Sequence, residues 1–383
     1  RLCSSLAARR YLPAPAPLPA KKALSPGRIR IAYLSADYVQ HAVMRVLAEV
    51  FELHDRSRFE IYAYAYGERQ SGGMNERLRH AFEHYVDASA MSDEQAARHI
   101  HAQGIDIAVD LMGYTRGERL GILARRPAPI AVNYIGYPGT LCLPFIDYIV
   151  GDATLMPPEL TPHYSEAIVR LPHCYLPTDR QRPIALPPPR QALGLPPDAF
   201  VFCAFSGNYK ISPDIFAIWL RLLAAVPGSV LWLVKGSEDA SANLRAQAQQ
   251  AGIDPARLVF AERTRFDQYL ARYTLADLFL DTLPYNALAT ASDALWAGLP
   301  VLTQTGRSFA GRMAASLLHA VGLPELVTQT ADEYEALALR LATHAQELAA
   351  LRQRLKASTA LGSICLMTLS VTMPMPSAGN RKW

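Results

Sequence analysis

Short apolar runs alternate with amphipathic stretches along most of this chain, and this alternation constrains the fold more than any other feature. The runs in the first half are Ile29 to Leu34, Phe59 to Tyr66, Ile105 to Leu111, Ile130 to Ile135 and Ile146 to Val150. Their length and composition are typical of buried parallel strands. The stretches with helical spacing are Glu49 to His54, Asn75 to His84 and Asp93 to Gln103. The first half therefore predicts an α/β unit of repeated strand and helix pairs.

A proline-rich stretch, Pro177 to Pro197, interrupts the alternation and includes three successive prolines from position 187. Proline disrupts helices and central strands, so this stretch predicts an interdomain linker. Beyond it, apolar runs recur at Phe200 to Phe205, Val230 to Val234, Leu258 to Ala261, Asp277 to Asp281 and Pro300 to Thr303. Helical spacing recurs at Asp214 to Ala225, Asn243 to Ala251, Phe266 to Leu275, Thr290 to Ala297 and Arg312 to Val321. We predict two α/β domains, over residues 28–185 and 198–357.

Both ends of the chain lack this alternation. Residues 1–27 carry prolines at positions 13, 15, 17 and 19 and predict an extended linker. Glu333 to Ala357 has helical spacing, whereas residues 358–383 mix Met, Ser, Pro and Thr and predict an irregular tail.

The composition excludes several classes of protein. Half of the residues are hydrophobic, 19% are charged and the formal net charge is +4, as in a folded globular chain. Lys and Arg form no basic run interleaved with aromatics, and no apolar run reaches the roughly 18 residues that span a bilayer, so neither nucleic acid nor a membrane is an expected partner. The five cysteines form no CxxC pair, which favours a reducing, cytoplasmic location over a zinc knuckle or a disulfide framework.

His80 and His84 lie four residues apart in a predicted helix, a spacing that can bring two imidazoles to one metal ion. No HExxH or comparable carboxylate motif accompanies them, so we interpret the pair as part of a solvated helix face and expect no metal cofactor.

Two α/β domains predict a ligand cleft between the carboxyl ends of their strands. No GxGxxG follows the first predicted strand, and the chain has no Walker A lysine loop. A dinucleotide dehydrogenase and a P-loop ATPase are therefore both disfavoured. The absence of a GxSxG elbow also disfavours a serine hydrolase.

The most suggestive group of residues is Asn208 to Asp214, directly after a predicted strand, and it includes Lys210. Ser212 is a candidate helix N-cap and Pro213 suits the first helical position, which would put Lys210 beside the positive end of a helix. Such a place suits a phosphate held without a metal. A surface lysine before a well-capped helix is the alternative.

A second group follows the strand that ends near Asp281. Thr290 and Asp293 have the spacing of a capping box, and Asp293 could hold a ribose hydroxyl or serve only as a capping residue.

In the first domain, the loop Gly136, Tyr137, Pro138, Gly139, Thr140 follows a predicted strand. Its glycines would let a ligand approach the backbone, although most loops of this kind are only turns. His41 lies just past the first strand, where an imidazole could transfer protons near neutral pH or have a purely structural role.

Together these segments resemble the catalytic region of the O-linked N-acetylglucosamine transferase family, glycosyltransferase family 41, including its SPINDLY-like members. The resemblance runs from about Arg28 to about Leu355. Its most specific stretches are Arg125 to Ile130, Tyr134 to Thr140, Ile146 to Ile149, Tyr164 to Glu166, Leu171 to His173, Tyr209 to Ile211, Ser229 to Leu233, Leu280 to Thr282 and Asp293 to Pro300.

The resemblance implies a GT-B fold, in which two Rossmann-like domains face each other across a cleft and the C-terminal one holds the donor. It implies an inverting, metal-independent transfer of N-acetylglucosamine, or a related sugar, from a UDP-sugar to Ser or Thr of a protein acceptor. By this likeness the catalytic residues are His41 and Lys210. Lys210 also contacts the donor phosphates. Further donor-binding positions are Gly207, Tyr269, Thr290 and Asp293, of which Tyr269 would lie beside the uracil and Asp293 on the ribose.

The chain departs from the family at several of these positions. Leu288-Ala289 stands where the family has His-Thr, and Gly207 stands where an amide side chain is common. The tetratricopeptide repeats that precede the family's catalytic region do not appear, so residues 1–27 are expected to be the remnant of a missing repeat region. The alternatives are another GT-B enzyme, namely a protein N-glucosyltransferase or a UDP-sugar epimerase, and a degenerate nucleotide-sugar-binding protein without activity.

Overall fold

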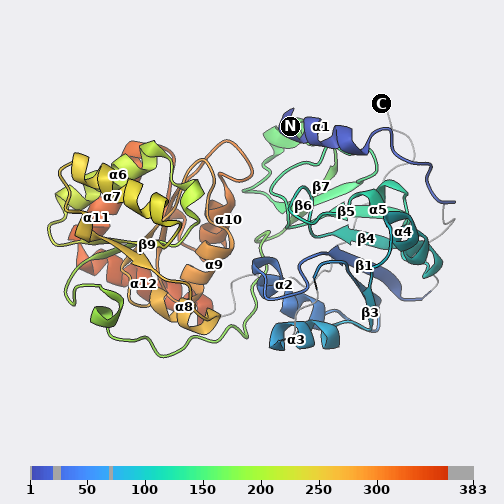
Figure 1. Cartoon of the computed structure of the whole chain (residues 1–383), viewed down its shortest axis with the longest axis horizontal. Coiled ribbons are helices and arrows are strands. Elements are labelled where there is room, and N and C mark those ends of the chain that lie inside the picture. The colour runs from blue at the N-terminus through green and yellow to red at the C-terminus, as the bar shows by residue number, and fades with distance from the viewer. Residues whose placement is uncertain (1, 20–26, 69–71, 361–383) are drawn as a thin grey trace.

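The computed structural model describes residues 2–19, 27–68 and 72–360. It contains two parallel sheets, each with helices packed on it, and the two domains lie side by side with α2 facing α9 where they meet (Figure 1). The predicted α/β class is confirmed.

The N-terminal sheet has seven strands in the order β3-β2-β1-β4-β5-β6-β7, all paired in parallel. The strands are β1 (Ile29–Ser35), β2 (Phe59–Ala65), β3 (His84–Asp87), β4 (Ile107–Asp110), β5 (Ile130–Asn133), β6 (Tyr148–Asp152) and β7 (Ala167–Leu171). The helices are α1 (Leu2–Ala8), α2 (Ala42–Glu52), α3 (Gly73–Ala81), α4 (Asp93–Ala102) and α5 (Gly121–Ala124).

Both faces of this sheet are buried, which explains its continuous apolar runs. In β1, Ile31 and Tyr33 enter the core that includes α2, whereas Ala32 and Leu34 enter a second core with α4 and α5. Successive side chains of a strand point to opposite faces, so a strand covered on both sides needs no polar alternation.

The C-terminal sheet has six strands in the order β10-β9-β8-β11-β12-β13. They are β8 (Val201–Ala204), β9 (Val230–Val234), β10 (Leu258–Ala261), β11 (Leu278–Leu280), β12 (Val301–Gln304) and β13 (Val327–Thr328). The helices are α6 (Pro213–Ala225), α7 (Glu238–Gln250), α8 (Phe266–Tyr273), α9 (Ala289–Trp296), α10 (Met313–Ala320), α11 (Ala331–Thr343) and α12 (Ala345–Ala360). In both sheets the strand order reverses beside the first strand, β1 or β8, and such a reversal creates a ligand crevice at the carboxyl edge.

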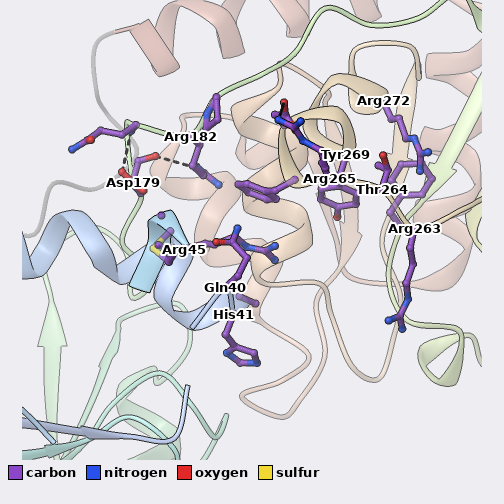
Figure 2. Close-up of a pocket in the computed structure, with 18 of the residues that line it drawn as sticks. Gln40, His41, Arg45, Asp179, Arg182, Arg263, Thr264, Arg265, Tyr269 and Arg272 are labelled. Atoms are coloured by element: carbon purple, nitrogen blue, oxygen red, sulfur yellow. Dashed lines mark hydrogen bonds and ion pairs between the residues drawn. The ribbon is translucent and has the colours of Figure 1, made fainter. Parts of the chain in front are cut away.

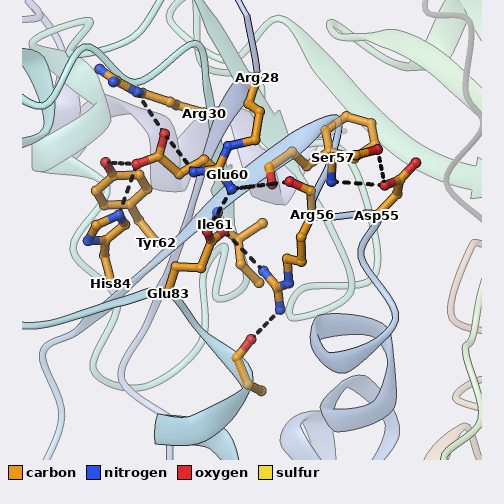
Figure 3. Close-up of polar contacts among 12 residues, drawn as sticks. Arg28, Arg30, Asp55, Arg56, Ser57, Glu60, Ile61, Tyr62, Glu83 and His84 are labelled. Carbon is orange, nitrogen blue, oxygen red and sulfur yellow. Dashed lines mark hydrogen bonds and ion pairs between the residues drawn. The ribbon is translucent and has the colours of Figure 1, made fainter.

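The predicted helix over Asn75 to His84 is too long. Phe82 leaves the helical conformation and packs on Phe51 at 4.6 Å between ring centroids, so α3 ends at Ala81. His84 lies on β3, stacks on the ring of Tyr62 at 4.2 Å and bonds to Glu60 at 2.9 Å (Figure 3). The interpretation of His80 and His84 as one helical face is therefore wrong.

The predicted extended linker at the start of the chain is wrong for residues 2–11. Residues 2–8 form α1 and Arg9–Tyr11 a 3-10 turn. Ala8 is buried in the second core, and the Tyr11 hydroxyl donates to Glu118, so side-chain packing overrides the linker-like composition.

At the other end, α12 includes residues 358–360, which were predicted as tail. The rest of the predicted tail, from residue 361, lies outside the described residues. No helix in the described ranges is both long and apolar enough to cross a bilayer.

The segment between the two sheets, residues 172–200, is only partly an exposed linker. Its second half includes exposed prolines 187–189. In its first half Thr178, Asp179 and Arg182 are buried. Asp179 accepts two hydrogen bonds from Arg77 of α3, at 2.6 and 3.1 Å. This half therefore packs as part of the boundary between the domains.

Candidate functional site

Three cavities adjoin one another, and residues of both domains line two of them. The largest, about 1320 Å³, is lined by α2 and α3 of one domain, by the interdomain segment and by residues 261–272 of the other domain. Figure 2 shows Gln40, His41 and Arg45 on one side of it and Thr264, Tyr269 and Arg272 on the other. A second cavity of about 570 Å³ shares His41 with the first and Gly136 with a third cavity of about 190 Å³.

Lys210 lines the third cavity, together with Gly207 and Thr290 of its own domain and with Gly136 and Pro138 of the other. As predicted, Ser212 caps the following helix, α6, and Pro213 is its first residue. The Lys210 ammonium donates to the carbonyl oxygen of Asn286 at 2.9 Å and lies 4.0 Å from the centre of the Tyr285 ring.

Burial lowers the pKa of Lys210 to about 8, although the nearby Asp281 carboxylate opposes this shift. A half-buried ammonium whose direct contacts, among the described residues, are a carbonyl oxygen and an aromatic ring has unused capacity for an anion. A phosphate would restore the favourable interactions that it lost with water.

Helix α9 begins beside Lys210. Its N-cap is Leu288, and no side chain caps its first backbone N–H groups. The predicted capping box of Thr290 and Asp293 is wrong, because the helix starts one residue earlier and the Asp293 carboxylate turns to Arg182. Leu288, Ala289 and Thr290 line the cavity with Lys210, so the uncapped N–H groups of the helix and the lysine ammonium lie beside the same cavity.

Asp293 is buried and forms an ion pair with Arg182 of the interdomain segment, at 2.8 Å between Nη1 and Oδ1. Burial raises the pKa of Asp293, and the Arg182 charge opposes this shift. Of the two partners only Arg182 lines the largest cavity. Sequence reasoning missed Arg182, because a lone arginine among prolines carries no local signal of burial.

His41 is the N-cap of α2 and lines both larger cavities, with 45% of its side chain exposed. Its Nδ1 lies 3.2 Å from the Asp37 carboxylate and 3.4 Å from the backbone N–H of Val43. The first contact needs a proton on Nδ1 and the second needs a lone pair there. The Val43 N–H donates to Nδ1, so the neutral imidazole has its lone pair there. Asp37 is the carboxylate with which a protonated His41 would pair, and the sequence did not reveal it.

Tyr269 lines the largest cavity and belongs to a chain of hydroxyls that leads to α9. Its hydroxyl bonds to that of Tyr273, which donates to the carbonyl oxygen of Thr290 at 3.3 Å. Burial of the Tyr269 ring raises the pKa of its hydroxyl well above the usual range. Gly207 lies at the other end of the site, where a side chain would meet the ring of Tyr209 at 2.6 Å.

Glu166 fixes the end of the loop from Gly136 to Thr140. This buried carboxylate accepts from the hydroxyl of Thr140 at 2.5 Å and from the N–H of Leu141 at 2.6 Å. The rings of Tyr137 and Tyr114 meet edge to face at 5.3 Å. Gly136 and Pro138 line the Lys210 cavity. Tyr137, Gly139 and Thr140 do not line it, and their contacts with the rest of the domain hold the loop in place.

Replacing Gly136 by alanine is expected to destabilise the protein by about 2 kcal/mol or more, because the new methyl group would meet backbone that cannot move aside. An added Cβ would lie 2.2 Å from the carbonyl oxygen of Leu111 and 2.6 Å from that of Met112. Thermal unfolding measures the loss. Gly73→Ala is the control, since its Cβ would have no atom within 4 Å. Equal stability of the two variants would contradict the close approach.

Cation-rich lining distinguishes the largest cavity, which contains Arg45, Arg77, Arg182, Arg263, Arg265 and Arg272. Arg45 lies over the Phe266 ring at 4.2 Å and so connects α2 to α8 across the cleft. Within the described ranges, no group of three or more His, Cys, Asp or Glu side chains is placed to hold a metal ion.

Comparisons with known proteins agree on one family. The chain matches the model of glycosyl transferase family 41 over residues 13–187 and 182–365. It is 37% identical over 366 residues to the probable UDP-N-acetylglucosamine–peptide N-acetylglucosaminyltransferase SEC of Arabidopsis thaliana, a match that covers 93% of this chain and 38% of that protein. It is 31% identical over 346 residues to the probable enzyme of the same kind, SPINDLY, of Petunia hybrida, covering 88% and 36%. The chain thus spans less than two fifths of the length of these relatives.

Solved structures show the same likeness. A mutant of the O-GlcNAc transferase of Thermobaculum terrenum aligns with a TM-score of 0.86 and 33% identity, over 95% of this chain and 69% of that one. HepE of Anabaena, solved with UDP and glucose, aligns with a TM-score of 0.57 and 14% identity, a likeness of fold alone.

Proposed function

Because the chain belongs to glycosyl transferase family 41 and has the GT-B fold, we propose that it moves N-acetylglucosamine, or a related sugar, from a UDP-sugar to serine or threonine hydroxyls of proteins. One observation carries the proposal. Lys210, the uncapped start of α9 and the Gly136 loop line one cavity that both domains build. This arrangement suits a diphosphate whose sugar faces the acceptor side of the cleft.

In the proposed reaction, the acceptor hydroxyl attacks the anomeric carbon from the face opposite the diphosphate. The bond from that carbon to the diphosphate oxygen breaks, and the configuration inverts. Lys210 and the N–H groups of α9 meet the negative charge that UDP gains, in the way that preorganised donors stabilise other oxyanions. We propose that these groups replace a metal ion. The imidazole of His41, beside the Asp37 carboxylate, is the candidate to accept the proton of the hydroxyl.

Calorimetric titration with UDP tests the donor site. We expect the wild-type chain to bind, and the double variant Leu288→His, Ala289→Thr to bind about 10-fold more tightly, because each added polar group can contribute a hydrogen bond to the diphosphate. Absence of binding by both proteins would contradict the proposal. Binding only after the double substitution would mark the chain as a decayed transferase. UDP binding without any sugar transfer would favour the degenerate binding protein, which Leu288 and Ala289 in the Lys210 cavity suggest.

Product analysis separates the enzymatic alternatives. Mass spectrometry of peptides incubated with UDP-N-acetylglucosamine is expected to show the sugar on serine or threonine. Sugar on asparagine would indicate a protein N-glucosyltransferase activity, and an isomerised UDP-sugar without peptide modification would indicate an epimerase.

A further inference from the structure

Tyr285 is an aromatic residue that lies outside both hydrophobic cores. It is 38% exposed and lines the Lys210 cavity. Its neighbours fix the backbone around it. The Thr282 hydroxyl donates to the carbonyl oxygen of Tyr285 at 2.7 Å, and the side chain of the buried Asn286 donates to the carbonyl oxygen of Thr282 at 2.8 Å. The fold itself therefore places the ring beside the cavity.

The Tyr285 ring contacts the Lys210 ammonium. Nζ of Lys210 lies 4.0 Å from the centre of the ring, well within the roughly 6 Å over which an aromatic face attracts a cation. The same ammonium donates to the carbonyl oxygen of Asn286 at 2.9 Å, so two consecutive residues supply these contacts. Among the described residues that line the cavity, Lys210 is the only Lys, Arg, His, Asp or Glu. An aromatic ring and a carbonyl oxygen thus hold the cation of this cavity.

The Asp281 carboxylate, just after β11, is close enough to favour the charged form of Lys210. Both of its oxygens already accept hydrogen bonds, from the N–H of Ala287 at 2.7 Å and from the hydroxyl of Thr303 at 2.6 Å. Burial raises the pKa of Asp281 to about 6, so its charge is nearly complete above pH 7. Because these donors occupy Asp281, the ammonium rests on the Tyr285 ring and stays available to an anion in the cavity.

The other titratable groups beside the cavity are tyrosine hydroxyls. Tyr209 and Tyr285 line it, and burial raises the pKa of Tyr285 above its usual range. The residues of the N-terminal domain that line the cavity have no titratable side chain. Between pH 7 and 9.5 a change of charge at this cavity is therefore mainly that of Lys210.

We infer that Tyr285 is a positioning residue for Lys210, whose ammonium the ring face holds at the wall of the cavity, where an anionic ligand can reach it. The inference rests on the proposed function, under which that anion is the diphosphate of the donor. Tyr285 acts through Lys210 and needs no contact with the reacting atoms. A leucine in its place would remove the attraction of the ring for the cation but would still shield the ammonium from water.

The test follows the charge of Lys210 directly, by an NMR titration of the protein without ligand. The Lys210 signal, assigned by comparison with Lys210→Ala, is expected to titrate near pH 8. Tyr285→Leu is expected to lower this midpoint by about 0.5–1 pH unit, the usual size of a partly buried attraction between a cation and a ring. Tyr285→Phe keeps the ring and should restore the midpoint of the wild type.

Turnover gives a second readout. With UDP-sugar and acceptor peptide at pH 8, Tyr285→Leu is expected to lower kcat about 10-fold, because fewer molecules have a charged and correctly placed Lys210. The KM for the peptide should stay within about 2-fold, since the acceptor does not depend on this contact. Tyr285→Phe should recover most of the lost turnover.

Phe260→Leu is the matched control. The guanidinium of Arg245 lies 4.8 Å from the centre of the Phe260 ring, in the same domain, and Phe260 lines none of the three cavities. This variant also exchanges a ring beneath a cation for leucine. It should leave the Lys210 midpoint and the turnover unchanged.

Two kinds of result would overturn the inference, and they differ. An unchanged or raised Lys210 midpoint in Tyr285→Leu, or a midpoint that Tyr285→Phe does not restore, would show that the ring does not hold the charge, while the donor site stays intact. Absence of UDP binding by the wild-type chain would remove the proposed function and, with it, the role of Tyr285 in the reaction.

Discussion

Lys210→Ala is expected to lower turnover by about 100-fold to 1000-fold, the usual effect of removing one group that stabilises a developing negative charge. Lys210 lies beside the start of α9, and within the described part of the chain its ammonium contacts a carbonyl oxygen and an aromatic ring. Release of UDP from the UDP-sugar in the presence of acceptor peptide measures the effect. Lys235→Ala, which removes a lysine paired with Glu238 and Glu262, is the control. Near-normal turnover of Lys210→Ala would exclude this lysine from the mechanism.

The pH dependence of Lys210 gives the same prediction a second readout. With a pKa of about 8, the lysine loses its charge as the pH rises through 8. If only the charged form binds UDP, affinity at pH 9.5 is about 30-fold lower than at pH 7.

Stability should change in the opposite direction over this window. The pKa of Lys210 is lower in the folded chain than in the unfolded chain, so the unfolded chain holds more protons between about pH 8 and 10.5. Stability of the wild type relative to Lys210→Ala therefore rises with pH, by about 2 kcal/mol between pH 7 and 10. An unchanged difference in the free energy of unfolding would contradict the lowered pKa.

Asp293→Ala is expected to destabilise the protein by about 3–5 kcal/mol, because it leaves the Arg182 charge buried without its counterion. Burial already lowers the pKa of Arg182, and Asp293 is the largest of the interactions that oppose this shift. Chemical denaturation measures the change. Glu335→Ala, which breaks an ion pair with the exposed Arg221, should cost about 1 kcal/mol or less.

A double variant, Arg182→Met with Asp293→Leu, separates the cost of an unpaired charge from the loss of packing. Since it removes both charges together, it is expected to recover most of the stability lost by Asp293→Ala. A double variant as unstable as the single one would show that shape at this position matters more than charge.

Periodicity in the sequence predicted the α/β class because buried parallel strands are apolar on both faces, and β1 and β9 are such strands. It failed for β3, where His84 and Asp87 give a short edge strand a polar composition. It also failed for α1, whose seven residues are ordered by packing of Ala8 on a distant core.

The candidate site shows the same limit. The sequence preferences of helix starts identified Lys210 as a candidate, since Ser212 and Pro213 mark a helix start within three residues of it. They misplaced the start of α9, because Leu288 carries none of the usual capping chemistry. They could not pair Arg182 with Asp293, which are separated by 111 positions in the sequence. Contacts of this kind follow from tertiary packing, for which a single sequence has no periodic signal.

The interdomain segment has buried residues in its first half and exposed prolines in its second half, and this difference affects the exchange of domains between relatives. Thr178, Asp179 and Arg182 are buried at the boundary, and Arg182 pairs with Asp293 of α9, whereas Leu186 is 95% exposed. A chimera joined within the exposed prolines that follow would carry Arg182 from one parent and Asp293 from the other. Such hybrids should be more stable between parents that share both residues, so their compatibility would depend on this buried ion pair more than on the exposed prolines at the junction.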